Sequence, residues 1–301
     1  MPVKAIVTIP PYAPFIDEVL RHPIVEGVRL NTVMPVKEPL EGLLQRLDAK
    51  ARGNGKQFWI DLKCRQLRIK TYGVPPFTEI ELTHKIQVNV PTKAYFSDGT
   101  QCATVLQVDG NRLIMQEGPQ RVVGPGEAVN IPDPSLRVEG YFTDTDKGYI
   151  DAGLKVGVKR YMLSFVEGKA DIDALKGLYP EAEIVAKIES VRGLDYVVGE
   201  WKNEAHLMAA RGDLYMEVQL PHHVIDACQM IVQKDREAIV ASRIFPSLSE
   251  SPIPSCQDIG DVDSLLRMGY RRFMLGDDLC MRRETVLSGL NLLAAMAAKK
   301  Y

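Results

Sequence analysis

Lys187, Glu189 and Asp213 carry the strongest chemical signal in the sequence. Lys187 and Glu189 stand two residues apart at the end of an apolar run, and in a strand such residues point to the same face. Asp213 follows the next apolar run. Carboxylates are the oxygen ligands that Mg²⁺ prefers, and a nearby lysine could stabilise an enolate or donate a proton. We therefore predict a divalent-metal site at Glu189 and Asp213, with Lys187 as its catalytic cation.

Polar residues also follow other apolar runs of the chain. Arg29 and Asn31 are again two residues apart, and Ser242 with Arg243 ends a later run. One charged pair at a strand end is usually a solvated or ion-paired structural feature. Several such ends that meet in one place favour a functional site instead. The interpretation therefore depends on an architecture that brings the strand ends together.

Eight short apolar runs alternate with amphipathic helical stretches along the chain. Continuous apolar runs separated by helices are typical of buried parallel strands. The predicted strands cover residues 3–9, 27–30, 58–62, 160–166, 183–188, 206–210, 238–241 and 271–275. The predicted helices cover 15–21, 40–51, 144–156, 171–178, 191–200, 223–234, 261–268 and 284–299. We predict an α/β fold, a (β/α)8 TIM barrel with its site at the carboxyl ends of the strands. A doubly wound sheet would show a similar alternation.

Residues 72–137 break this alternation. Glycine-containing turns such as Asp109-Gly110-Asn111 and Ser97-Asp98-Gly99 separate β-type runs at 104–108 and 112–115, which predict short antiparallel strands. We expect a small inserted β domain after the third barrel strand, with residues 1–71 and 138–301 forming the barrel domain. At the mouth of a barrel such an insertion could act as a lid.

Composition narrows the classes of partner. The 301 residues carry a net charge of −2 and no long Lys/Arg run, so we expect no nucleic-acid partner. No stretch approaches the roughly 20 apolar residues of a membrane span, which predicts no membrane partner. The five cysteines are scattered and the N-terminus lacks the features of a secretory signal, so we expect a cytoplasmic protein.

A series of short motifs follows the order found in one known enzyme family. The matching segments are 4–11, 28–31, 60–68, 95–99, 128–132, 164–166, 186–190, 210–214, 240–242 and 273–275. The most specific are Lys187-Ile188-Glu189 and the five residues from Ala210 to Leu214, at this separation. Over nearly its whole length the sequence resembles the pyruvate kinase family.

The resemblance implies a role for each of the three residues first singled out. Glu189 and Asp213 would hold Mg²⁺ or Mn²⁺, which bridges oxygens of pyruvate or its enolate. Lys187 would stabilise that enolate. The expected small-molecule partners are phosphoenolpyruvate or a 2-oxo acid, with ADP or ATP as a further candidate.

The resemblance also implies a set of substrate contacts. The backbone N–H groups of Gly212 and Asp213 would bind the substrate carboxylate. Ser242 stands near the reacting carbon, where the family has a threonine, and Arg29 would contact the transferred phosphoryl group. The remaining predicted substrate-binding residues are Asn31 and Arg68.

Several positions depart from the family pattern. Val33 and Leu62 replace expected K⁺ ligands, so we predict that the K⁺ site is lost. Met34 replaces a histidine on the nucleotide side, Glu127 stands where a lysine is expected, and Tyr215 replaces a glycine. The chain ends after the eighth helix, so we expect no C-terminal regulatory domain and a monomer or homodimer.

These departures fall on the nucleotide half of the site, while the metal and enolate half is kept. We expect a pyruvate kinase-like, Mg²⁺-dependent enzyme that acts on phosphoenolpyruvate or pyruvate-type 2-oxo acids through a metal-stabilised enolate. One alternative is a metal-dependent C–C lyase, aldolase or decarboxylase that uses the same enolate without a nucleotide. A second alternative is a non-catalytic metabolite-binding regulatory protein.

Overall fold

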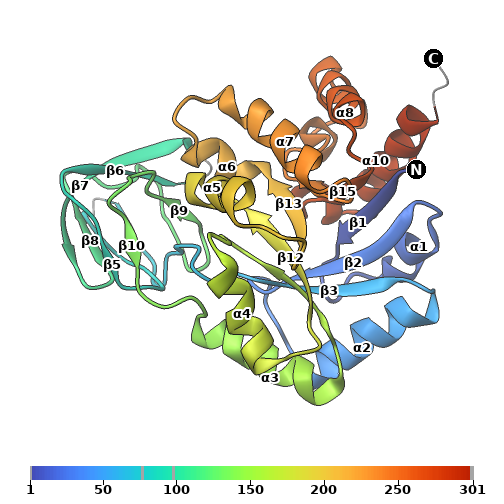
Figure 1. Ribbon diagram of the computed structural model, residues 1–301, viewed down its shortest axis with the longest axis horizontal. Coiled ribbons are helices and arrows are strands. Elements are labelled where there is room, and N and C mark those ends of the chain that lie inside the picture. The colour runs from blue at the N-terminus through green and yellow to red at the C-terminus, as the bar shows by residue number, and fades with distance from the viewer. Residues whose placement is uncertain (1, 76–77, 97–98, 299–301) are drawn as a thin grey trace.

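Eight parallel strands form a closed barrel in the computed structural model, which describes residues 2–75, 78–96 and 99–298. The strands follow one another around the barrel in the order β1-β15-β14-β13-β12-β11-β3-β2, and helices lie outside them (Figure 1). Their bounds are β1 Lys4–Thr8, β2 Val25–Asn31, β3 Gln57–Leu62, β11 Arg160–Leu163, β12 Glu183–Ile188, β13 His206–Ala210, β14 Ile239–Ala241 and β15 Arg272–Leu275. The predicted TIM barrel is confirmed, and the doubly wound alternative is excluded.

The outer helices agree with the predicted ones within two residues at each end, except that the helix predicted at 261–268 begins five residues earlier. They are α1 Ile16–Arg21, α2 Leu40–Gly53, α3 Asp144–Val156, α4 Lys169–Leu178, α5 Val191–Gly199, α7 His223–Lys234, α8 Cys256–Met268 and α10 Arg283–Ala297. Residue 299, where the last predicted helix ends, lies outside the described residues. Side-chain caps explain several of the starts: the hydroxyl of Thr143 accepts the N–H of Asp146 before α3, and the hydroxyl of Ser190 accepts the N–H of Gly193 before α5. No helix in the described part of the chain is long and apolar enough to cross a membrane.

Among the described residues, three short helices that were not predicted each follow a barrel strand closely at its carboxyl end. These are α6 Arg211–Glu217, the 3₁₀ helix η2 Pro246–Ser249 and α9 Asp277–Cys280. Each has two turns or fewer and begins within five residues of its strand, so no separate hydrophobic period marks it in the sequence. They matter because they form part of the mouth of the barrel.

Along the barrel strands, successive side chains point alternately into the barrel and outward toward the helices. On β3, Trp59 packs inside the barrel with the other interior apolar residues, whereas Ile60 and Leu62 pack outward in the core shared with the helices. The same period of two points Asp61 and Lys63 inward beyond Trp59. The apolar filling of the barrel therefore gives way to charged side chains toward the carboxyl ends of the strands.

A second, antiparallel sheet is inserted between β3 and α3 and lies to one side of the barrel (Figure 1). Its strand order is β4-β8-β7-β6-β9, with bounds β4 Glu79–Glu81, β6 Thr92–Phe96, β7 Gln101–Asp109, β8 Arg112–Met115 and β9 Val129–Asn130. A two-stranded sheet pairs β5 Ile86–Gln87 with β10 Arg137–Val138. The antiparallel strands predicted at 104–108 and 112–115 are confirmed as β7 and β8, while residues 97–98 of one predicted turn lie outside the described residues.

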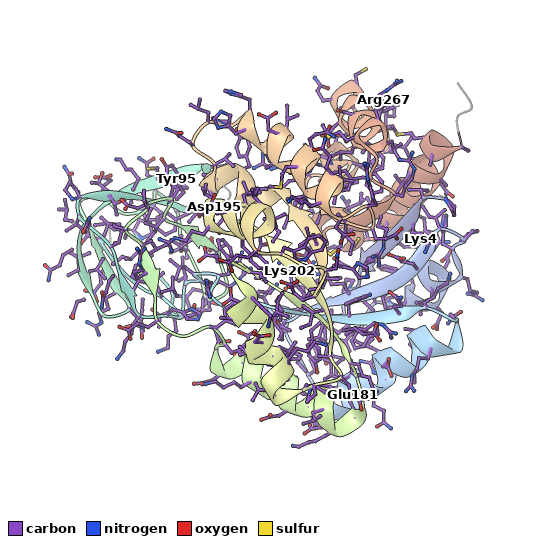
Figure 2. All side chains as sticks on the ribbon, in the orientation of Figure 1. Lys4, Tyr95, Glu181, Asp195, Lys202 and Arg267 are labelled. Atoms are coloured by element: carbon purple, nitrogen blue, oxygen red, sulfur yellow. The ribbon has the colours of Figure 1, made fainter. Side chains whose placement is uncertain are left out.

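The inserted sheet has an apolar core of its own. This core begins at Leu67, a few residues before the predicted boundary, and an isolated bridge pairs Arg68 with Ala128 of the sheet. The division at residues 72 and 137 stays a prediction. Around both parts, side chains with nitrogen and oxygen tips project from the ribbon, Lys4 and Glu181 from the barrel and Tyr95 from the inserted sheet among them (Figure 2).

Candidate active site

A cavity of about 390 Å³ opens at the carboxyl ends of the barrel strands. Its lining includes every residue that the sequence analysis assigned to catalysis, substrate or metal: Arg29, Asn31, Arg68, Lys187, Glu189, Gly212, Asp213 and Ser242. They come from segments spread from β2 to the loop after β14. The structure therefore brings all of the predicted residues into one site, while their individual roles stay predictions.

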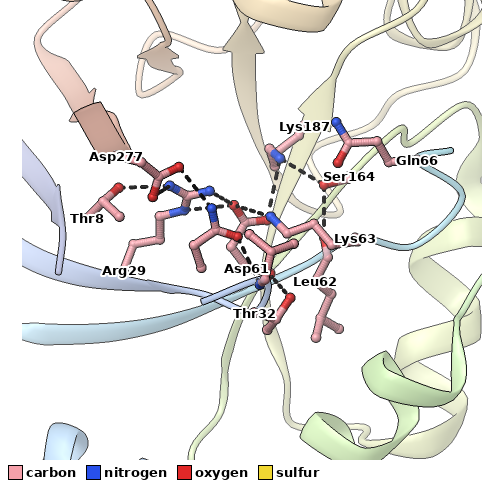
Figure 3. A network of polar contacts seen from close by, with 12 residues as sticks. Thr8, Arg29, Thr32, Asp61, Leu62, Lys63, Gln66, Ser164, Lys187 and Asp277 are labelled. Carbon is pink, nitrogen blue, oxygen red and sulfur yellow. Dashed lines mark hydrogen bonds and ion pairs between the residues drawn. The ribbon is translucent and has the colours of Figure 1, made fainter. Parts of the chain in front are cut away.

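Asp61 forms the base of this site and was not predicted to belong to it. Its carboxylate is fully buried and accepts two hydrogen bonds from Arg29, with Nε at 2.7 Å (Figure 3). The ammonium groups of Lys63 and Lys187 lie 3.3 and 3.4 Å from it. Burial would raise the pKa of Asp61, but these three cations outweigh burial and hold it well below its usual range. Asp61 is therefore ionised at neutral pH and is the common partner of these three cations.

Lys187 is the ammonium group best placed for chemistry. Its Nζ donates to the hydroxyl of Ser164 at 2.8 Å and lies 3.4 Å from Asp61 (Figure 3). It also lies 3.1 Å from Glu189. Burial lowers the pKa of Lys187, but the two carboxylates raise it above its ordinary value. At Lys63, by contrast, burial outweighs Asp61 and lowers the pKa. Of these two lysines, Lys187 therefore holds its proton more firmly.

Glu189 is also buried and receives fewer compensating contacts. Its Oε2 accepts the backbone N–H of Phe165 at 2.8 Å, and Lys187 is the ammonium beside Oε1. Burial raises the pKa of Glu189 to about 7, with Asp213 adding to the effect and Lys187 opposing it. Both pKa values are raised, with opposite effects on charge. Two carboxylates stabilise the positive charge of Lys187, whereas burial and the negative charge of Asp213 disfavour the ionised form of Glu189.

Asp213 lies in the first turn of α6 with both carboxylate oxygens held by amide groups. Gln66 Nε2 donates to Oδ2 at 2.8 Å, and Asn130 Nδ2 donates to Oδ1 at 3.0 Å. Gln66 in turn accepts Arg68 Nε at 3.0 Å through its own oxygen. Asn130 belongs to β9, so the inserted sheet fixes the orientation of a carboxylate at the barrel mouth.

Glu189 and Asp213 fit the donor set of Mg²⁺ or Mn²⁺. They follow neighbouring strands, β12 and β13, and their charges interact. Among the residues that the structure describes, no cluster of three or more His, Cys, Asp or Glu side chains could hold a metal ion. The pair would therefore share an ion with water and substrate oxygens, which is how Mg²⁺ is commonly bound.

Ser242 and Gly212 lie close together in the lining of the cavity. A Cβ atom at residue 212 would lie 3.3 Å from the Ser242 hydroxyl oxygen, so glycine leaves room for that hydroxyl. Ser242 has a left-handed backbone, with φ of 66°. Arg211 holds this loop by donating to the Ser242 carbonyl at 3.0 Å while it pairs with Asp261 at 2.7 Å. The position of the serine is therefore set by both neighbours.

Five further residues in or beside the site had been left without a role. Asp61 and Lys63 could have been predicted, because they stand two apart at the end of the third strand and must face the barrel interior as Trp59 does. Gln66 follows the strand in a loop, and Asn130 lies in a different sheet, so nothing in the local sequence links either to Asp213. Asp277 follows the eighth strand and accepts Asn31 Nδ2 at 2.9 Å.

Comparison with known proteins gives one consistent result. The family described as "Pyruvate kinase, barrel domain" matches residues 76–278. The pyruvate kinase of Methanocaldococcus jannaschii is 23% identical over 299 residues, which cover 92% of this chain and 66% of that protein. Those of Borreliella burgdorferi and Thermoplasma acidophilum are 23% and 29% identical, over 69% and 52% of this chain and 45% and 30% of their own lengths. The chain thus spans less than two thirds of the length of these relatives.

Proposed function

This chain belongs to the pyruvate kinase family, and we propose on that premise that it is a divergent enzyme of the family that works through a metal-stabilised enolate. Its substrates would be phosphoenolpyruvate or pyruvate-type 2-oxo acids. The observation that carries the proposal is the position of Lys187, which is held positive by Asp61 and lies 3.1 Å from Glu189, one of the two carboxylates that fit a divalent metal.

The chain's own residues would bind and orient the acid around that charge. When bound by Glu189 and Asp213, Mg²⁺ or Mn²⁺ would supply the Lewis acid that stabilises negative charge on the substrate oxygens. Lys187 would add its positive charge where the enolate oxygen develops. The N–H groups of Gly212 and Asp213, in the first turn of α6, lack intrahelical acceptors and would bind the carboxylate. The Ser242 hydroxyl would stand near the reacting carbon.

Arg29 is the proposed contact for a phosphoryl group. Its Nε and Nη2 are committed to Asp61, and its Nη1 donates to Thr8 at 2.8 Å and lies 3.5 Å from Asp277. The long contact to Asp277 is the weakest of these. A phosphoryl oxygen would replace that contact and leave the others in place.

A nucleotide-free enolate reaction, such as that of a C–C lyase, aldolase or decarboxylase, is the second candidate. It is favoured by Glu127, which stands where the resemblance predicts a lysine. Glu127 accepts the N–H of Gly124 at 2.7 Å and pairs with Arg121 on the inserted sheet. Glu127 thus offers no positive charge to the phosphates of ADP, which weighs against phosphoryl transfer and leaves enolate chemistry untouched.

ATP formation from phosphoenolpyruvate and ADP with Mg²⁺, followed by a coupled assay, tests the leading proposal. We expect turnover that depends on the divalent ion. If no nucleoside diphosphate supports turnover but the pyruvate methyl protons still exchange, the phosphoryl-transfer assignment is wrong and the lyase class stands. If pyruvate or oxalate raises the melting temperature and neither reaction occurs, the protein is a metabolite-binding regulator.

We expect K⁺ to change the activity less than about twofold. Asp61 is already surrounded by Arg29, Lys63 and Lys187, so its charge needs no added cation. The Leu62 side chain packs in the core outside the barrel and offers no oxygen. Initial rates in K⁺ and in tetramethylammonium salts at equal ionic strength provide the measurement. Strong activation by K⁺ would show that a monovalent-cation site persists.

Metal affinity should fall at acid pH because Glu189 must lose its proton to bind the ion. Its pKa is raised to about 7, so the carboxyl is protonated below that pH and ionised above it. We expect Mn²⁺ affinity, measured by electron paramagnetic resonance, to rise about tenfold per pH unit below 7 and to level off above it. Glu189→Gln should bind Mn²⁺ weakly and without this pH dependence. An affinity that stays constant from about pH 5.5 to 8 would contradict the assignment.

The proposal also covers the cellular compartment and the oligomeric state of the protein. All five cysteines are free thiols, which suits a reducing compartment, and we propose a cytoplasmic protein. We also propose a monomer or homodimer. Light scattering coupled to size-exclusion chromatography would measure the mass.

A further inference from the structure

Arg243 is a cation of the cavity that the proposed function leaves unused. It follows Ser242 directly on the loop after β14 and lines the same cavity as Lys187. Its guanidinium lies over the ring of Tyr215, 4.3 Å from the centroid. Within residues 2–75, 78–96 and 99–298, no carboxylate forms an ion pair with it. The structure thus presents an arginine at a ligand cavity with a stacking platform and no anionic partner.

The other cations of the cavity are already occupied. Arg29, Lys63 and Lys187 all contact Asp61, and Lys187 also contacts Glu189. Arg68 donates to Gln66 and to the carbonyl of Gly126. A newly bound anionic group would have to compete with those contacts. At Arg243 it would displace only water.

Both ends of Arg243 are fixed in place. Its backbone is left-handed, with φ of 55°, between Ser242 at 66° and, two residues on, Phe245 at 52°. Such conformations are unfavourable for residues other than glycine, and they cluster at ligand-binding and active sites. Arg211 donates to the carbonyl of Arg243 at 3.1 Å, and Tyr215 supports the guanidinium. Arg243 is exposed, but these contacts hold its backbone and its guanidinium beside the cavity.

We infer that Arg243 binds a second anionic group of the substrate, so that the site prefers 2-oxo acids that carry a second carboxylate. The inference rests on the proposed function, because it places the first carboxylate at Gly212 and the reacting carbon beside Ser242. A substituent on that carbon would then extend toward the next residue of the loop, Arg243. Arginine suits the role because its planar fork can accept a carboxylate bidentately while its face stays stacked on Tyr215.

The size of the cavity agrees with a larger acid than pyruvate. About 390 Å³ would hold roughly a dozen water molecules at about 30 Å³ each. Pyruvate has only about half that number of non-hydrogen atoms. With a metal ion and water also in the cavity, the space still admits a four- or five-carbon diacid, which reaches further along its wall.

Binding of matched acid pairs tests the inference. Isothermal titration calorimetry with Mg²⁺ would compare 2-oxoglutarate with 2-oxopentanoate, and freshly dissolved oxaloacetate with 2-oxobutyrate; within each pair a carboxylate replaces a methyl group. We expect the diacid of at least one length to bind about tenfold tighter or more than its monoacid. Arg243→Gln should bring that ratio close to one. Arg236→Gln, which removes an exposed arginine outside the cavity, should keep it.

A second set of variants tests the stacking platform. Tyr215→Phe keeps the ring and should keep the diacid preference, whereas Tyr215→Leu should reduce it several-fold although Arg243 is still present. Circular dichroism would confirm that each variant is folded. A diacid-to-monoacid ratio near one in the unchanged protein, or one that survives Arg243→Gln, would overturn the inference, as would a loss of ADP binding alone in that variant. Failure of every acid to bind would instead overturn the proposed function.

Discussion

Asp61→Asn is expected to lower the free energy of unfolding by about 3–5 kcal/mol, the cost of breaking a buried ion pair from one side. Asp61 has no exposed surface, and its carboxylate is the shared partner of Arg29, Lys63 and Lys187. The asparagine would leave three largely buried cations without their central negative charge. Arg29 should be affected most, because it donates two hydrogen bonds to this carboxylate.

Asp277→Asn is the matched control for that variant. Asp277 also pairs with Arg29, but at 3.5 Å and with 40% of its side chain exposed. We expect this change to cost less than about 1 kcal/mol, as exposed pairs do. Urea denaturation near neutral pH would measure both variants. Equal losses in the two would show that the Asp61 cluster does not hold the barrel mouth together.

The pH dependence of the Asp61 effect has a defined sign. The pKa of Asp61 lies lower in the folded protein than in the unfolded chain. Its ionised form therefore stabilises the fold above the ordinary carboxyl range, and the stabilisation is lost as pH falls. The difference between Asp61→Asn and the unchanged protein should shrink below about pH 4.

Lys187→Met is expected to slow exchange of the pyruvate methyl protons by about 10²–10³-fold, the usual effect of removing one charge-stabilising group from a site of this kind. Methionine keeps most of the length of the side chain and removes the ammonium that lies 3.1 Å from Glu189. The proposed metal ligands, Glu189 and Asp213, are unchanged, and saturating Mg²⁺ would keep the ion bound although the pKa of Glu189 rises without Lys187. The enolate oxygen would lose the cation that is positioned for it.

Lys63→Met separates this catalytic role from a general loss of positive charge. Lys63 lies 3.3 Å from Asp61, almost the same distance as Lys187 at 3.4 Å, but only Lys187 also pairs with Glu189. We expect Lys63→Met to slow exchange less than about tenfold. Similar rates for the two variants would mean that Lys187 acts only through Asp61.

The barrel could be predicted because its pattern is local and repeated. Each strand is a continuous apolar run buried on both faces, and each outer helix shows an apolar stripe. The short helices α6 and α9 could not be predicted in this way, because each begins within two residues of the end of a strand and has no apolar stripe of its own. The bounds of the inserted domain were also poorly marked. Leu67 belongs to its core although it follows β3 by only a few residues.

The candidate site was predictable where side chains alternate along one strand. Lys187 with Glu189, and Arg29 with Asn31, follow from a period of two and from the shared direction of parallel strands. Asp61 obeys the same rule, but its importance comes from three cations that the chain brings from different strands and loops. The amides that hold Asp213 come from a loop and from a second sheet, so their contacts depend on the packing of the whole molecule.

Exchange of the methyl protons of pyruvate in D₂O with Mg²⁺, followed by proton NMR, tests the central claim most directly. It requires an enolate and no nucleotide, so it does not depend on the half of the site that departs from the family. The account predicts exchange well above that of Mg²⁺ alone, lost on chelation of the metal and in Lys187→Met. Exchange no faster than with the metal alone, under conditions where pyruvate is bound, would contradict it.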